Sequence, residues 1–247
     1  MPQLKFPLQV KNRSIDSTNA SSALNMRSKL LDAAADLFKA ESFAAVSVAA
    51  VAEAAGAFPS QVTYYFGSKN AMFVEAACRE ILYVAQSAEQ AASTSKSATA
   101  YRDALVRSTV GQSGLSFFLE ALTLARHQPT VQPLIARTIE RLHHEGERAF
   151  AEVRETRGWK VTASDTITAQ RFWALVMSLS LRNSALGLDH QQTQNDLKTL
   201  LAGDFLDQSA AAHHPKKLGS KPVADMRTAS QPSKRNKPIE PLRLIKP

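Results

Sequence analysis

Two short stretches carry side chains that could do covalent or metal chemistry. The letters GQSG at residues 111–114 resemble the start of a nucleophile elbow, but Leu115 stands in the place of the closing glycine and no strand is expected before it. His143, His144 and Glu147 are the only local cluster of metal-ligating types, yet a zinc helix needs a third ligand and usually the order His-Glu-x-x-His. We expect a loop between helices in the first stretch and a solvated helix face in the second. The sequence therefore predicts no enzyme, no metal site and no cofactor.

A third stretch carries side chains suited to recognition. Ser60 and Gln61 directly follow Pro59. In the major groove of DNA a glutamine pairs bidentately with adenine, a serine hydroxyl bonds to several bases, and an apolar side chain such as Phe58 or Pro59 touches the methyl group of thymine. The alternative for Phe58 is that it folds back on Val62. Base reading requires a helix whose N-terminal part enters the groove.

The surrounding residues predict such a helix. Ser47 can cap a first short helix whose apolar residues recur every three or four positions. Gly56 suits the turn that ends it, and Pro59 has its φ pre-set for the first position of a second helix. Ser68 can cap a third helix. Two short helices joined by a glycine turn form a helix-turn-helix, here at about residues 47–66.

Composition and length favour a helical protein. The 247 residues are 44% hydrophobic, and nine glycines lie scattered among long Ala/Leu-rich runs, with no alternating β pattern. Cys78 is the single cysteine, so an internal disulfide is excluded. We interpret Cys78 as a small apolar residue on a helix. No signal-peptide core and no run of about 18 apolar residues is present. We expect a soluble, cytoplasmic protein without a membrane partner.

Periodicity places further helices along the chain, so the expected fold class is all-α. Residues 1–24 are polar and are expected to be disordered, and Asn25 is a plausible cap for a helix from Met26 to about Glu41. The later helices are expected at about residues 69–90, 100–110, 115–127, 131–157, 165–186 and 193–207.

The formal charge of +8 is unevenly distributed. Residues 1–25 carry +2, residues 26–207 carry −1, and residues 208–247 carry nine basic against two acidic groups. Prolines exclude a continuous helix from this last segment, which we expect to be a disordered basic tail. Net charge therefore supports phosphate attraction only for the tails.

Residues from Met26 to about Ala77 resemble the N-terminal domain of the TetR family of transcriptional regulators. The matching elements are DLF at 36–38, VSV at 46–48, AG at 55–56, YF at 65–66 and SK at 68–69. The sequence departs from the family at Ser42, where glycine is usual, at Phe58, where a small capping residue is usual, and at Thr63, where a tyrosine is usual.

This resemblance implies a three-helix DNA-binding domain at residues 26–70 and a helical bundle for ligand binding and dimerisation at 71–207, between the tails 1–25 and 208–247. It implies phosphate contacts from Ser47, Thr63, Tyr64, Tyr65 and Lys69, in addition to base contacts from Phe58, Pro59, Ser60 and Gln61. We expect Tyr65 to be the tyrosine that packs in the core. Arg27 is expected either to face a phosphate or to be a solvated surface charge.

The resemblance also implies partners. A homodimer would present two reading helices to a palindromic operator in double-stranded DNA, with the last two long helices, including Leu197 and Leu201, at the subunit interface. The alternative is that these helices only close the core of a monomer. A small-molecule effector would bind among residues 100–190 and release a repressor from DNA. Its weak candidate contacts, which core packing explains equally well, are Phe117, Phe118, Leu122, Phe172 and Trp173.

A rival hypothesis is a helical protein that binds a small molecule or a partner but has lost DNA reading. Residues 26–70 carry four basic and four acidic side chains and are therefore neutral. Thr63 replaces a tyrosine of the family pattern. Both features favour the rival hypothesis. Sequencing the DNA that the purified protein selects from random duplexes would distinguish it from a DNA-reading regulator.

Overall fold

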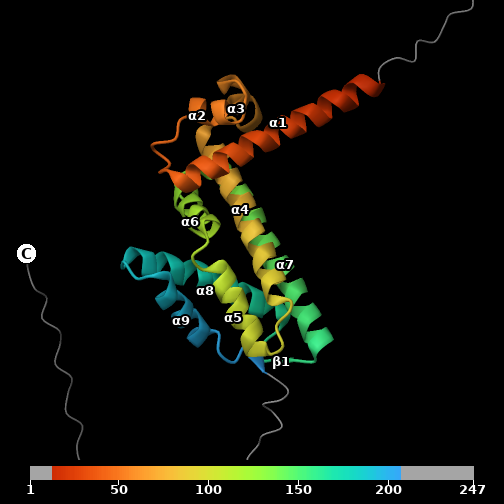
Figure 1. Cartoon of the computed structure of the whole chain (residues 1–247), viewed down its shortest axis with the longest axis vertical. Helices are drawn as coiled ribbons and strands as arrows, with labels where there is room; N and C mark the ends of the chain where they lie inside the picture. Colours follow the sequence, from red (N-terminus) through yellow and green to blue (C-terminus); the bar gives the residue numbers. More distant parts are fainter. Residues whose placement is uncertain (1–12, 207–247) are drawn as a thin grey trace, which may run out of the picture. The chain divides into compact units, whose positions relative to one another are not determined.

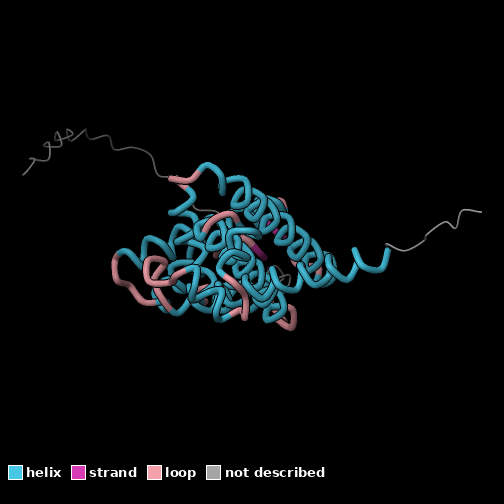
Figure 2. Tube along the Cα trace, turned by 90° about the horizontal axis from the view of Figure 1, so that it is seen from above, coloured by secondary structure: helices cyan, strands magenta, loops and turns pink. Residues whose placement is uncertain are grey.

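The structure, a computed structural model, describes the backbone of residues 13–206 and the side chains of residues 24–205. Helices make up nearly all of this part (Figures 1 and 2), which confirms the all-α class. The elements are α1 (Arg13–Ala40), α2 (Val48–Ala54), α3 (Pro59–Phe66), α4 (Lys69–Ala92), α5 (Ala98–Thr109), α6 (Ser113–Ala125), the 3₁₀ turn η1 (Pro129–Val131), α7 (Gln132–Arg157), β1 (Lys160–Val161), α8 (Asp165–Ala185), α9 (His190–Leu200) and β2 (Phe205–Leu206).

The first helix is longer than expected, since α1 begins at Arg13 and not at Met26. Asn25, the expected cap, lies in mid-helix. No glycine or proline interrupts the sequence between Arg13 and Ala40. The serines and asparagines of this segment each disfavour a helix by only about 0.5 kcal/mol, too little to end one that is anchored further along. The expected disorder of residues 1–24 is therefore wrong for residues 13–24, while residues 1–12 lie outside the described residues.

The last helix is shorter than expected. α9 ends at Leu200, and the chain turns through Gly203, whose φ of 90° few residues with a side chain adopt. Phe205 then pairs with Val161 in an antiparallel two-residue ladder. The expected extension of the helix to residue 207 is therefore wrong, because a β-ladder replaces its last turns.

Four phenylalanines join α1 and the loop after it to the rest of the core. Phe38 of α1, Phe43 of the following loop and Phe117 of α6 surround Phe73 of α4. The centroid of the Phe73 ring lies 4.9, 4.8 and 4.9 Å from those of Phe38, Phe43 and Phe117, in edge-to-face geometry. We call this set the aromatic joint.

The buried core is continuous from α1 to α9, and residues 13–206 belong to one compact unit. α4 contacts α1, α5, α6 and α7, so it crosses the expected boundary at residue 70 without a break. The expected division at residue 70 into a DNA-binding domain and an effector-binding domain therefore stays a prediction about function and does not correspond to a break in the structure. The expected basic tail, 208–247, lies outside the described residues. No helix of the described part is long and apolar enough to cross a membrane.

Candidate DNA-binding surface and effector cavity

The predicted helix-turn-helix is present. The Ser47 hydroxyl accepts a hydrogen bond from the N–H of Ala50 (3.0 Å) and so caps α2, while its own proton stays free to donate. Gly56 turns the chain with a φ of 64°, and the N–H of Ala57 closes the turn on the carbonyl of Ala52 (2.8 Å). α3 begins at Pro59, as expected.

One face of α3 is exposed. Ser60, Thr63 and Tyr64 are spaced three and four residues apart and all lie on the surface; we call them the reading face. Val62, on the opposite side, is buried, and Tyr65 is half-buried against the core, which confirms the expected assignment of the two tyrosines. Tyr64 as a whole residue is 82% exposed.

Phe58 is also exposed, at 76%, immediately before α3. The alternative that it folds back on Val62 is therefore wrong: Val62 is covered by the core without it. An exposed aromatic ring at the start of the second helix is available for an apolar contact with a base.

The side-chain amide of Gln61 already makes a hydrogen bond within the protein. Its Oε1 accepts a hydrogen bond from the backbone N–H of Phe58 (3.0 Å) and so caps the start of α3. A bidentate contact with adenine uses both the oxygen and the nitrogen of the amide. The Nε2 donors and one lone pair of Oε1 remain available in this geometry, so bidentate reading requires adenine to share Oε1 with the N–H of Phe58 or the cap to open.

Lys69, an expected phosphate contact, is held by Phe43. Its Nζ donates to the carbonyl oxygen of Phe43 and lies 4.3 Å from the centroid of that ring. The lysine thus fastens the start of α4 to the loop after α1. A phosphate contact through this side chain would have to compete with both interactions.

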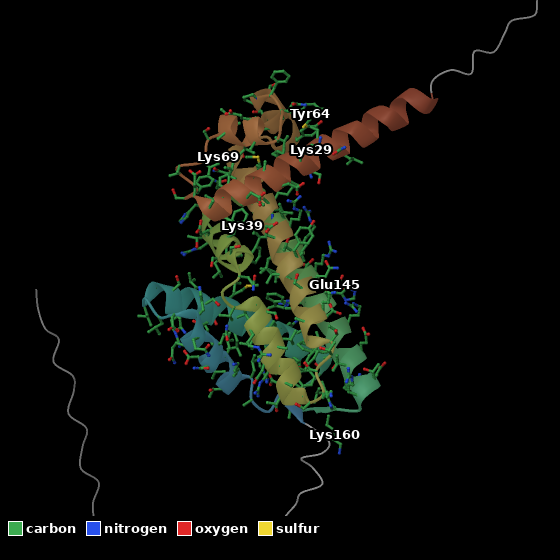
Figure 3. All side chains as sticks on the ribbon, in the orientation of Figure 1. Lys29, Lys39, Tyr64, Lys69, Glu145 and Lys160 are labelled. Carbon is green, nitrogen blue, oxygen red and sulfur yellow. The ribbon has the colours of Figure 1, made fainter. Side chains whose placement is uncertain are left out.

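Two cations of α1 form ion pairs with α4. Arg27 bonds to Glu75 (2.6 Å), and Lys39 bonds to Glu80 (2.7 Å). Both expectations for Arg27, a phosphate contact or a solvated charge, are therefore replaced by an ion pair. Lys29 is exposed, and no carboxylate among the described residues pairs with it. Figure 3 labels it in the same part of the molecule as Tyr64.

A cavity of about 450 Å³ lies between α4, α5, α7 and α8. Phe172 and Trp173 border it, as expected. Phe117, Phe118 and Leu122 do not: Phe117 belongs to the aromatic joint, Phe118 is fully buried, and Leu122 packs against the core. Their apolar character reflects the packing of α6.

Charged side chains that sequence reasoning missed surround this cavity. Arg148 bonds to Glu89 (2.8 Å) and to Glu145 (3.1 Å), and these hydrogen bonds, Glu89 first, raise the pKa of its guanidinium. Arg79 and Arg141 border the same space. They were missed because charges that face a cavity look the same in a sequence as charges that face water.

The stretches considered for catalysis are structural. Gly111 and Gln112 lie between α5 and α6, as expected of a loop, but Ser113 and Gly114 already belong to α6, so the loop expected at 111–114 is confirmed only in its first half. Glu147 accepts a hydrogen bond from the hydroxyl of Thr166 (2.8 Å), and the described residues contain no group of three metal-ligating side chains. Burial raises the pKa of the Cys78 thiol to about 11, against the opposing effect of a hydrogen bond with Thr138.

The last helices also leave apolar side chains exposed. Ile167 and Leu181 of α8 and Leu200 of α9 are 49%, 53% and 53% exposed. Leu197 and Leu201, the expected interface residues, are instead 0% and 3% exposed within one subunit. Because Leu197 and Leu201 belong to the core of the single subunit, substitutions at these positions cannot test a contact with a second copy.

Comparison with known proteins agrees with this geometry. Residues 30–76 match the family described as "Bacterial regulatory proteins, tetR family", and residues 98–202 match "Bacterial transcriptional repressor C-terminal". A protein from Rhodococcus sp. RHA1, assigned as a transcriptional regulator, is 30% identical; the match covers 71% of this chain and 93% of that one, with a TM-score of 0.63.

More distant structures share the fold. The fatty acid degradation regulator FadR from Bacillus halodurans is 12% identical, with 72% of this chain and 95% of that one covered and a TM-score of 0.51. A protein from Saccharomonospora viridis, assigned as a transcriptional regulator and solved in complex with choline, is 16% identical over 74% of this chain and 98% of that one, with a TM-score of 0.56. No protein of curated function matches the sequence. The helix-turn-helix, the helical body behind it and the 30% identical relative together establish that the chain belongs to the TetR family of transcriptional regulators.

Proposed function

We propose that the protein is a repressor that binds a palindromic operator as a homodimer and leaves it when a small molecule fills the cavity. The reading face carries this proposal: Ser60, Thr63 and Tyr64 are exposed together on a helix that the turn at Gly56 positions. A helix presented in this way enters the major groove. The match of residues 98–202 to a repressor domain supports repression.

The groups on this surface differ in what they offer DNA. Ser60 lies near the N-terminus of α3, where side chains reach base edges, and Phe58 adds an apolar contact beside it. Thr63 and Tyr64 lie one turn further along and offer hydroxyl groups to the phosphate backbone. Gln61 contributes an amide donor while its oxygen caps the helix.

A homodimer through α8 and α9 supplies the two-fold symmetry of the operator. Leu181 and Leu200 would be covered by the same helices of the second copy, which explains large apolar side chains on an otherwise polar surface. Half-sites would then lie about one turn of DNA apart.

The cavity supports release by a ligand. α4 runs from the reading end at Lys69 to the cavity wall at Glu89, so a ligand that displaces this wall acts on the helix that carries α1–α3. Effector affinity and operator affinity are then linked in both directions.

Selection from random DNA duplexes with the full-length protein tests the proposal. A palindrome should be enriched, and Ser60→Ala should weaken its binding by about 1–3 kcal/mol and relax the base preference at one position per half-site. Tyr64→Phe removes only the hydroxyl and should weaken operator and random DNA by equal factors. Selection without any enriched sequence would favour the rival protein that has lost DNA reading.

A further inference from the structure

Three arginines and two glutamates line the cavity. Arg148 is bonded to Glu89 and Glu145, and also to Glu152 outside the lining, so this group already carries more negative than positive charge. Arg79 and Arg141 border the same space, and no carboxylate of the described residues that line the cavity pairs with them. Arg79 and Arg141 are therefore the cationic groups of the lining that an anionic ligand can meet.

Arg79 is the better placed of these two cations. One terminal nitrogen pairs with Asp32 of α1 (2.8 Å), while its Nε–H is buried and meets no acceptor among the described residues. A buried donor without an acceptor is an unfavourable arrangement that a ligand oxygen relieves. The Asp32 side chain is 63% exposed, so water screens the existing pair.

Much of the remaining wall is apolar and aromatic, with Gln86 and Thr109 as uncharged polar members. Leu142 and Phe150 of α7 and Phe172 and Trp173 of α8 line the cavity, each at most 6% exposed. A volume of about 450 Å³ falls within the range of small-molecule sites. Such a wall fits a flat or branched hydrocarbon body and leaves the charged end of the ligand to the arginines.

We propose that the effector is an organic anion with an apolar body of ring size, and that its anionic group takes Arg79 from Asp32. This inference rests on the proposed function of the cavity as the effector site. The exchange reaches the DNA-binding helices directly, since Asp32 belongs to α1.

Three ion pairs hold α1 on α4, formed by Arg27 with Glu75, Asp32 with Arg79, and Lys39 with Glu80. Of their six members, Arg79 alone borders the cavity. An anion in the cavity thus removes one attachment of α1 and leaves the other two. The Asp32–Arg79 pair therefore couples the charge of the ligand to the attachment of α1.

Two fluorescent probes with the same body separate charge from shape. Anilinonaphthalene sulfonate is anionic, and its uncharged parent, phenylnaphthylamine, lacks the sulfonate. Full-length protein should bind the anion about ten- to a hundredfold more tightly than the parent, as one charge-assisted hydrogen bond in a partly dry site allows. Arg79→Gln should remove this preference, whereas Asp32→Asn should strengthen binding of the anion several-fold and leave the parent unchanged.

Arg137→Gln is the matched control, because Arg137 is an exposed arginine of α7 that does not border the cavity. Equal binding of the two probes by the wild type, or an anion preference that survives Arg79→Gln, would overturn the anionic effector. An Asp32→Asn protein with unchanged affinity for the anion would overturn the exchange, even if Arg79→Gln did not fold. Failure of both probes to bind would remove the cavity as an effector site, and the DNA selection would still report separately on operator binding.

Discussion

Lys29 should account for most of the salt dependence that the described DNA-binding helices contribute. Three of the four cations in residues 26–70 have partners inside the protein: Arg27, Lys39 and Lys69. Each phosphate neutralised releases counterion and changes the slope of log affinity against log salt by about −0.9. Lys29→Gln should therefore make the slope shallower by about 0.9 per subunit, or ~1.8 for a dimer on its operator.

The measurement is a titration of fluorescent operator at several salt concentrations. Lys160→Gln is the matched control, since Lys160 is an exposed lysine that Figure 3 labels far from Lys29. It should leave the slope unchanged. Deleting residues 208–247, with nine basic groups, should also make the slope shallower but leave the preferred sequence unaltered. Identical slopes for Lys29→Gln and Lys160→Gln would show that Lys29 meets no phosphate. A large residual slope in a Lys29→Gln protein that lacks residues 1–13 as well as 208–247 would show that the paired cations are freed on DNA.

The remaining predictions concern the interface, the aromatic joint and the buried thiol. Leu181→Glu should give monomers that keep their helical circular dichroism and lose operator affinity, whereas Leu197→Glu should unfold the subunit; a dimeric Leu181→Glu in sedimentation would place the interface elsewhere. Phe117→Ala should lower the free energy of unfolding by about 3–5 kcal/mol in chemical denaturation, and a loss below about 1 kcal/mol would mean that the joint is loosely packed. Because burial raises the pKa of Cys78 to about 11 from 9.0, its contribution to stability is complete below pH 9 and is lost as the pH rises towards 11. Alkylation should accordingly be slow at pH 8 in the native protein and fast in denaturant; rapid native alkylation would contradict the burial.

Local signals in the sequence were sufficient for the helix-turn-helix. Ser47, Gly56 and Pro59 each act on the backbone within a few residues, and the structure has the cap, the turn and the helix start at these positions. The start of α1 was missed because Asn25 is an acceptable cap but also an acceptable helix residue. Propensity alone does not decide between these states.

The partners of charged side chains were not predictable from the sequence. Lys69 looked like a phosphate contact, but it is fastened to Phe43, 26 residues earlier in the chain. Arg79 gave no signal, since its roles depend on a contact with α1 and on a cavity formed by four helices. Pairings over such separations follow from tertiary packing.

The aromatic joint limits how reading heads can be exchanged between regulators. Phe38 and Phe43 arrive with the DNA-binding segment, while Phe73 and Phe117 stay with the body. A chimera that grafts a foreign head onto this body would leave Phe73 without two of its three edge-to-face neighbours unless the graft carries aromatic residues at both positions. Successful grafts should therefore be those whose donor supplies this pair, whatever sequence its recognition helix reads.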